Sequence, residues 1–185
     1  MRSRWASILS IPICRSKEKR HRTQGWFEGF RDFAEVVPEV DGETCFISVY
    51  GREADIFELF DTQRHFPCVE QLARAKYDRD LGKGRPKLFA LMSGRASYGL
   101  IDIKIERLTE RPKTSLVKAR LVRQKRLASC ELRFRRITLP STGASQGAEP
   151  VSLYGVHVRE TVPPEGEDRV QWFLLTTERV CTAKK

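Results

Sequence analysis

The sequence predicts an α/β fold whose first half alternates helices with strands and whose second half is antiparallel β. Two patterns lead to this prediction. Residues 26–60 combine apolar side chains at helical spacing with a short β-rich run, which is typical of alternating α/β structure. From Gly99 onward apolar and polar residues alternate, which is typical of half-buried strands. We therefore expect two units, residues 17–98 and residues 99–180, preceded by a non-native or disordered segment over residues 1–16.

The first half is expected to contain helices and strands in alternation. Apolar residues at helical spacing predict an amphipathic helix that ends near Pro38, and these residues are Trp26, Phe30, Phe33 and Val37. The β-rich run TCFISVY over residues 44–50 is typical of a buried parallel strand, and Gly51 ends it. The expected elements that follow are a helix over residues 52–61, a strand over about 71–76, a loop over 77–87 and a short helix over 88–92.

The second half is expected to be a set of antiparallel strands. Turn-rich stretches over residues 141–150 and 163–168 separate its later parts. The predicted strands lie around residues 101–105, 117–121, 130–134, 151–158 and 170–176. We interpret this half as an insertion or subdomain attached to the α/β part.

The charge of the chain favours an anionic partner. Lys and Arg total 34 against 24 Asp and Glu, which gives a formal net charge of +10 at pH 7. Residues 101–140 alone hold twelve Lys or Arg against four acids. Such a concentration suits a surface that follows phosphates, because each cation that neutralises a phosphate releases a condensed counterion. A solvated basic surface would give the same pattern.

Several other function classes lack their signatures. The five cysteines are scattered and the three histidines are isolated, so neither a zinc site nor a disulfide framework is expected. Gly82-Lys83-Gly84-Arg85 lacks the Gly-Lys-Ser/Thr end of a P-loop. No apolar run approaches the ~18 residues of a membrane helix, so no membrane association is expected. The odd cysteine count fits a reducing cytosol, and we expect a cytoplasmic protein.

An ordered set of motifs resembles one known family. The run ISVYGREADIFELF over residues 47–60 is similar to the segment around the second catalytic aspartate in DDE transposases of bacterial insertion sequences, the Tn-five and IS-four type. Further similar segments follow the family's order and lie at residues 26–29 (WFEG), 73–76 (ARAK), 163–166 (PPEG) and 170–177 (VQWFLLTT). The resemblance covers roughly residues 17–183. It implies a partial RNase H-like core followed by a β-rich insertion, as an internal fragment of such an enzyme.

The resemblance also implies chemistry that this chain lacks. In the family three carboxylates hold two Mg²⁺ ions, which activate the attacking oxygen and stabilise the leaving one. The second carboxylate position is Gly51, the first has no room before Trp26, and the third would lie beyond Lys185. Glu53 and Asp55 are the nearest acids, but a ligand displaced by about 1 Å already damages such chemistry. We expect no catalytic residues, no metal ligands and no bound Mg²⁺ in this chain.

The residues expected to face DNA are better preserved. By resemblance Arg52, Arg74 and Lys76 contact phosphates near the cleaved end, and Trp172 stacks on a base flipped out of the DNA. The alternative is that these three cations are ordinary strand-end charges and that Trp172 belongs to the core.

Three hypotheses follow for the function. The first is a catalytically inactive transposase fragment that binds transposon-end DNA in the bacterial nucleoid, with another transposase chain as a dimer partner. The second is a small basic DNA-binding regulator of a full-length transposase. The third is a pseudogene-like product that does not fold stably, because its parallel core leaves strand edges unpaired.

Overall fold

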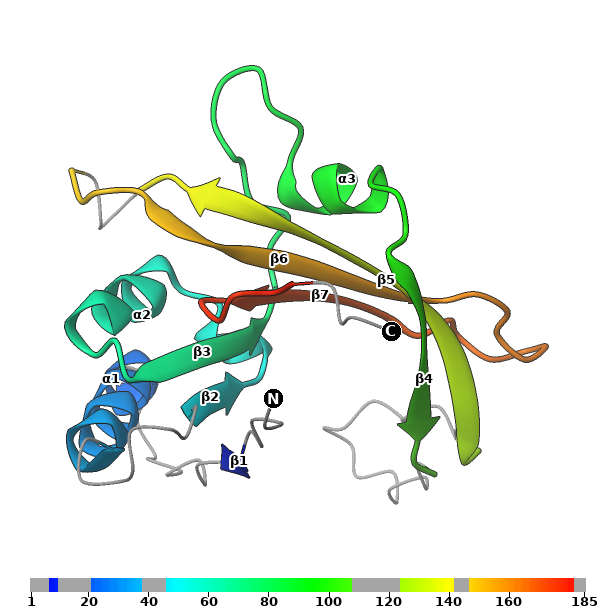
Figure 1. Cartoon of the computed structure of the whole chain (residues 1–185), viewed down its shortest axis with the longest axis horizontal. Coiled ribbons are helices and arrows are strands. Elements are labelled where there is room, and N and C mark those ends of the chain that lie inside the picture. Colours follow the sequence, from blue (N-terminus) through cyan, green and yellow to red (C-terminus); the bar gives the residue numbers. More distant parts are fainter. Residues whose placement is uncertain (1–6, 10–20, 38–45, 108–123, 142–146, 182–185) are drawn as a thin grey trace, which may run out of the picture.

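The computed structural model describes residues 7–9, 21–37, 46–107, 124–141 and 147–181 (Figure 1). The predicted strand over residues 117–121 and most of the segment 1–16 lie outside these ranges. In chain order the helices and strands are β1 Ser7–Leu9, α1 His21–Val36, β2 Phe46–Tyr50, the 3₁₀ helix η2 Arg52–Ala54, α2 Phe57–Thr62, the 3₁₀ helix η3 Gln63–His65, β3 Val69–Arg74, α3 Leu88–Ser93, β4 Gly99–Ile105, β5 Arg126–Leu139, β6 Val151–Glu160 and β7 Gln171–Thr176.

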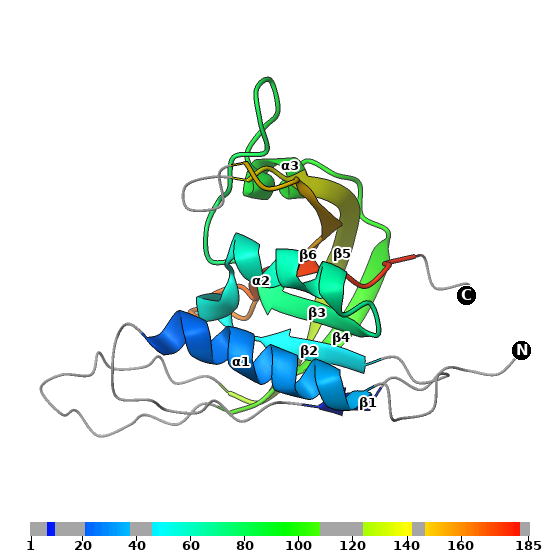
Figure 2. The same ribbon diagram turned by 90° about the vertical axis from the view of Figure 1, so that its left-hand side faces the viewer.

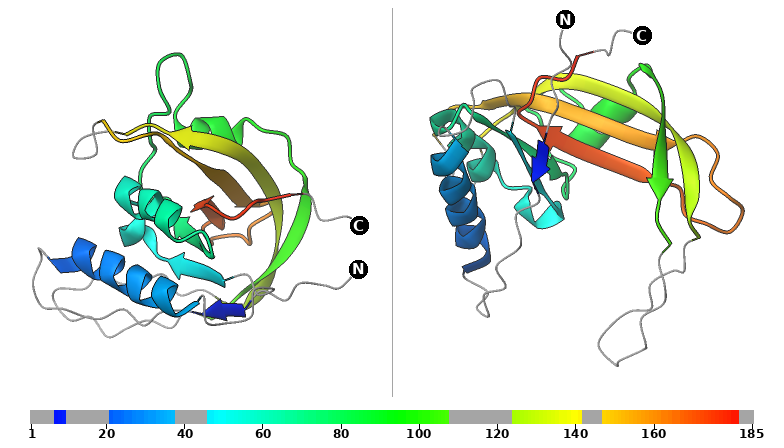
Figure 3. Two further views of the ribbon diagram at one scale, coloured as in Figure 1. Left: turned by 60° about the vertical axis from the view of Figure 1, so that its left-hand side comes forward. Right: turned by 60° about the horizontal axis from the view of Figure 1, so that its bottom comes forward.

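The strands form one mixed sheet in the order β1-β2-β3-β7-β6-β5-β4. The short strand β1, β2 and β3 pair in parallel. The remaining neighbours, from β3 across to β4, pair antiparallel. The sheet is strongly curled, and the long strands β5 and β6 bend into a half-barrel (Figure 3). The pairing of β3 with β7 therefore joins the parallel first half and the antiparallel second half in a single sheet.

The three α-helices bury the apolar residues of one face of this sheet. Phe30 of α1, Phe60 of α2 and Met92 of α3 belong to one buried cluster with Leu153 of β6 and Leu175 of β7. Helices α1 and α2 lie beside β2 and β3, and α3 lies over β5 and β6 (Figure 2). A second cluster takes alternate residues of the same strands, because successive side chains of a strand point to opposite faces. Its members include Cys130, Phe134, Val156 and Val158.

The structure confirms most of the predicted elements. The helix that ends before Pro38 is α1, the run FISVY is β2, and Gly51 directly follows it. The short helix after the loop is α3, and three strands of the antiparallel half are β5, β6 and β7. The predicted α/β class and the antiparallel second half are therefore correct at the level of the sheet.

The predicted helix over residues 52–61 is only partly correct, because the structure divides it into two parts. A 3₁₀ turn covers Arg52–Ala54, and α2 begins only at Phe57. Between them Asp55 and Ile56 leave helical geometry, and Ile56 is extended at φ −126° and ψ 136°. The break coincides with a tertiary contact, because the buried Asp55 carboxylate accepts hydrogen bonds from Lys76, Tyr77 and Arg79, which follow β3.

Three further corrections concern strands. The second predicted strand begins two residues earlier than expected, because β3 spans Val69–Arg74. Strand β4 is exposed over most of its length, with Leu100 65% exposed, although its alternation predicts a half-buried strand. A parallel strand does precede Trp26, since β1 pairs with β2, and its sequence Ser-Ile-Leu contains no carboxylate.

One finding concerns membranes. Among the described residues no helix is both long and apolar enough to span a bilayer.

Candidate nucleic-acid interface

The candidate interface lies at the edge of the sheet where β2 and β3 end. The two strands are parallel and Tyr50 pairs with Ala73, so their carboxyl ends meet at the same edge. Gly51 is the first residue past β2 and is exposed. Its φ of −75° and ψ of −172° are open to any residue, and no heavy atom lies within 4 Å of a Cβ built there. The position has room for a side chain that the sequence does not supply.

Two cations stand directly past the ends of these strands. Arg52 opens the 3₁₀ turn after Gly51 and is exposed. Lys76, two residues beyond β3, is also exposed, and its Nζ lies 3.1 Å from Glu53 Oε2 and 5.4 Å from the ring centre of Tyr77. The hydrogen bond to Glu53 raises the pKa of the Lys76 ammonium above its ordinary value. The ion pair also links the turn after β2 to the chain after β3.

Arg74 and Trp172 are placed by the pairing of β3 with β7. Arg74 is the last residue of β3, is half-buried and pairs with Leu174. The Ala75 amide donates to the Phe173 carbonyl at 2.8 Å, so the antiparallel alignment continues past the end of β3. If this antiparallel alignment is continued by one more residue pair, Trp172 lies opposite Lys76. Trp172, which is 120 residues after Arg52 in the sequence, therefore lies at the same end of the sheet.

The structure thus brings the four predicted DNA-facing residues to neighbouring positions. Arg52 and Lys76 are open to solvent, whereas Arg74 and Trp172 are half-buried. Trp172 packs against the second apolar cluster and pairs with Val158 of β6. Its ring therefore contributes to packing, and only the part left exposed is available to a stacking partner.

Asp55 has a structural role at this edge that the sequence pattern does not indicate. Its carboxylate is fully buried and accepts four hydrogen bonds. Its Oδ2 accepts from the Lys76 and Tyr77 amides at 2.7 and 3.1 Å. Its Oδ1 accepts from Arg79 Nε and Nη2 at 3.0 and 2.7 Å. Asp55 therefore holds the chain after β3 against the turn after β2, and the three residues that donate these bonds lie 21 residues or more away in the sequence.

The residues present do not fit the metal pair that the resemblance implies. Gly51 offers no ligand, Asp55 is saturated with hydrogen bonds, and Glu53 is paired with Lys76. Within the described ranges no three His, Cys, Asp or Glu side chains come together in a way that suits a metal ion. Hard oxygen ligands in octahedral geometry, which Mg²⁺ requires, are not assembled at this edge.

Comparison with known proteins found no family model that matches the chain and no similar curated protein. The likeness to transposases therefore rests on the ordered motifs in the sequence.

Proposed function

We propose that this chain is a catalytically inactive fragment of a DDE transposase that retains part of a DNA-binding surface. The observation that carries the proposal is the position of Gly51. It lies at the carboxyl end of a parallel strand, where the family's motif has its second aspartate, and Arg52 and Lys76 flank it. The parallel set β1-β2-β3 and the helix α1 beside it support a partial RNase H-like core for the first half, with the β-rich second half as its insertion.

The lack of phosphodiester chemistry follows from the ligand set. A two-metal mechanism needs carboxylates on neighbouring elements to hold both ions. At this edge one carboxylate position is glycine, and the two nearest acids are engaged with Lys76 and with Arg79. We therefore propose that the chain neither cuts nor joins DNA, and we derive no catalytic step.

DNA binding is the activity that the surface supports. Arg52 and Lys76 are exposed cations at one edge, and Arg offers a planar fork that suits phosphate oxygens. Together with the net charge of +10, this arrangement favours DNA as the partner, and the resemblance to transposases suggests that this DNA is a transposon end. A second candidate, a regulator that occupies the ends without cutting them and so competes with an active transposase, uses the same surface.

A cleavage assay tests the catalytic part of the proposal. The purified chain is incubated with labelled duplexes that carry insertion-sequence ends, with Mg²⁺ or with EDTA. We expect no nicking and no strand transfer in either condition. Cleavage that appears with Mg²⁺ and disappears with EDTA would overturn the assignment of the chain as inactive.

A salt titration of binding tests the DNA-binding part. Each phosphate contact contributes about 0.9 to the slope of log K against log salt for duplex DNA. We expect Arg52→Ala and Lys76→Ala each to lower that slope by roughly one. Arg31→Ala, on the exposed surface of α1, is the matched control and should leave the slope unchanged. Salt-independent affinity, or equal slopes for all proteins, would contradict a phosphate-contacting edge.

A further inference from the structure

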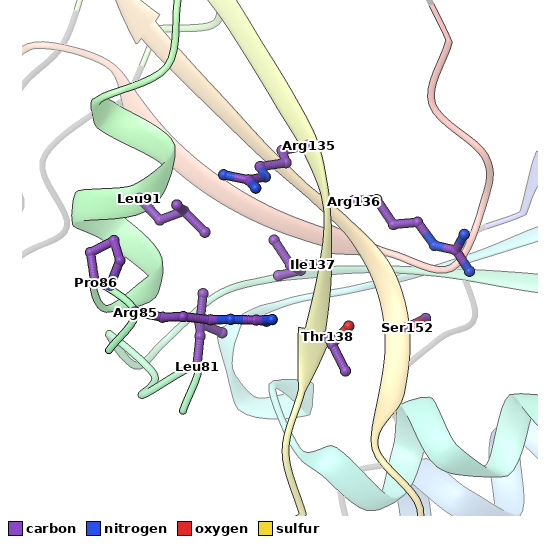
Figure 4. Close-up of a pocket in the computed structure, with 9 residues that line it drawn as sticks. All are labelled: Leu81, Arg85, Pro86, Leu91, Arg135, Arg136, Ile137, Thr138 and Ser152. Atoms are coloured by element: carbon purple, nitrogen blue, oxygen red, sulfur yellow. The ribbon is translucent and has the colours of Figure 1, made fainter. Parts of the chain in front are cut away.

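A pocket of about 590 Å³ lies away from the candidate interface, between the loop that leads into α3 and strand β5 (Figure 4). Leu81, Pro86, Leu91 and Ile137 supply apolar lining. Its basic lining comes from Arg85 on the loop and from Arg135 and Arg136 on β5, and no acidic residue lines it. A pocket with cations above apolar walls suits a ligand that is anionic and has an apolar part.

Two of the three arginines face into this pocket. Figure 4 shows the guanidinium groups of Arg85 and Arg135 in the space between the loop, α3 and β5. Arg136 points to the other side of the strand, as the alternation of β-strand side chains requires. Arg85 and Arg135 are exposed, and in the part of the chain that the structure describes neither has an ion-pair partner. Their donors are therefore available to a ligand.

The loop that carries Arg85 is held in place at its base. The Phe89 amide donates to Asp78 Oδ1 at 2.7 Å, and the Leu88 amide donates to the Arg79 carbonyl at 2.9 Å. Leu81 is buried and anchors the loop to the helix-side core. Arg79 itself is fixed by Asp55. The loop projects from the fold (Figure 1), but its attachment to the core is firm.

The tip of the loop turns sharply enough to direct Arg85 back toward β5. Gly82 and Gly84 have φ values of +104° and +74°, in the region that favours glycine. The Arg85 amide donates to the Gly82 carbonyl at 3.1 Å and closes the turn. The motif Gly82-Lys83-Gly84-Arg85, which does not match a P-loop, thus has a structural use: it shapes one wall of the pocket.

We propose that this pocket binds the sugar-phosphate backbone of a DNA strand, with Arg85 and Arg135 on phosphate oxygens and the deoxyribose against Pro86 and Leu91. The proposal rests on the DNA-binding function proposed above and adds a second contact to it. Three observations favour it: two guanidinium groups without an ion-pair partner among the described residues, an apolar wall between them, and the absence of any acid from the pocket's lining.

DNA is favoured over an acidic peptide by the position of the pocket in the chain. The loop that carries Arg85 begins directly after Lys76, so one chain segment supplies residues to both the candidate interface and the pocket. A DNA strand repeats its phosphates at regular intervals and can offer them to Arg85 and Arg135 whatever its sequence, whereas an acidic peptide would need carboxylates at matching positions in its sequence. The overall charge of +10 adds a general attraction for a polyanion.

The test is a salt titration of the full chain, the double variant Arg85→Ala/Arg135→Ala and the control Arg31→Ala, with a fluorescein-labelled DNA duplex as the probe. Two lost phosphate contacts should lower the slope of log K against log salt by roughly 1.8. Arg31→Ala, which changes the same residue type on the exposed surface of α1, should keep the parental slope. The conservative variant Arg85→Lys/Arg135→Lys should recover most of the slope, because it restores the two charges.

The outcomes separate this proposal from the proposed function. If the parent chain binds DNA with a steep salt slope and the double variant has the same slope, the pocket is not a DNA contact. If the double variant keeps its DNA slope but loses binding to a labelled oligoglutamate peptide, the pocket takes an acidic peptide instead and the proposal is wrong. Absence of DNA binding by the parent chain would overturn both.

Discussion

Replacing Asp55 by asparagine removes one charge from the most completely hydrogen-bonded carboxylate of the candidate interface. Asp55 is buried, and its two oxygens accept from the amides of Lys76 and Tyr77 and from the guanidinium of Arg79. An asparagine side chain has one oxygen and one NH₂ group. Whichever way it is oriented, a donor then faces either the two backbone amides or the guanidinium, so at least two of the four hydrogen bonds are lost.

The magnitude follows from the burial of both partners. The Arg79 side chain is only 19% exposed and the Asp55 side chain 0%, so the variant leaves a largely buried cation without its counterion. Breaking a buried ion pair by removing one partner costs about 3–5 kcal/mol. Because Arg79 keeps some contact with water, we expect a value near the lower limit, about 3 kcal/mol. For a chain of this size that corresponds to a fall in Tm of roughly 6–12 °C.

Urea unfolding followed by tryptophan fluorescence and circular dichroism measures this loss. The matched control is Glu53→Gln, which removes the exposed ion pair with Lys76 two residues away and should leave the midpoint unchanged. Arg79→Ala should destabilise less in the Asp55→Asn background than in the parent chain, because the pair is then already broken. A loss below about 1 kcal/mol for Asp55→Asn would refute the assignment of Asp55 as the residue that holds this edge together. A cooperative transition of the parent chain would also count against an unstable pseudogene product.

Three further predictions concern single positions. His157 is buried and stacks on Phe173 at 4.3 Å, and burial lowers its pKa to about 4. The free energy of unfolding should therefore be at its full value above about pH 6.5 and should fall by up to about 3 kcal/mol as the pH drops toward 4. In His157→Phe the urea midpoint should depend less on pH over that range, and an unchanged pH dependence would contradict the prediction. Gly155→Val should destabilise by about 2 kcal/mol in urea unfolding, since even a Cβ there lies 3.0 Å from Met92 Sδ; a stable variant would show that α3 shifts freely. Gly51→Asp should change stability by no more than about 0.5 kcal/mol, and it should not produce Mg²⁺-dependent cleavage, because one carboxylate does not complete a metal pair.

The local pattern of the sequence was sufficient to predict most individual elements. Apolar spacing located α1, the run FISVY located β2, and strict alternation located β5, because helices and strands repeat at different periods that are visible in a single segment. The position of Gly51 at a strand end was also predictable, since the strand and the residue that ends it are adjacent. The same local pattern failed over residues 52–61, where a strong helical pattern is interrupted at Asp55.

The sequence by itself determined the α/β class, the strands from β2 to β7, the basic character of the chain and the absence of a carboxylate at Gly51, whereas it did not indicate β1. Only the tertiary structure decided that β7 pairs with β3, which brings Trp172 level with Lys76, and that Arg85 and Arg135 share a pocket. The physical reason is the range of the interactions. Periodicity and side-chain charge are properties of short segments, whereas strand pairing and the burial of Asp55 against Arg79 join residues far apart in the chain, and many other pairings fit the same local patterns.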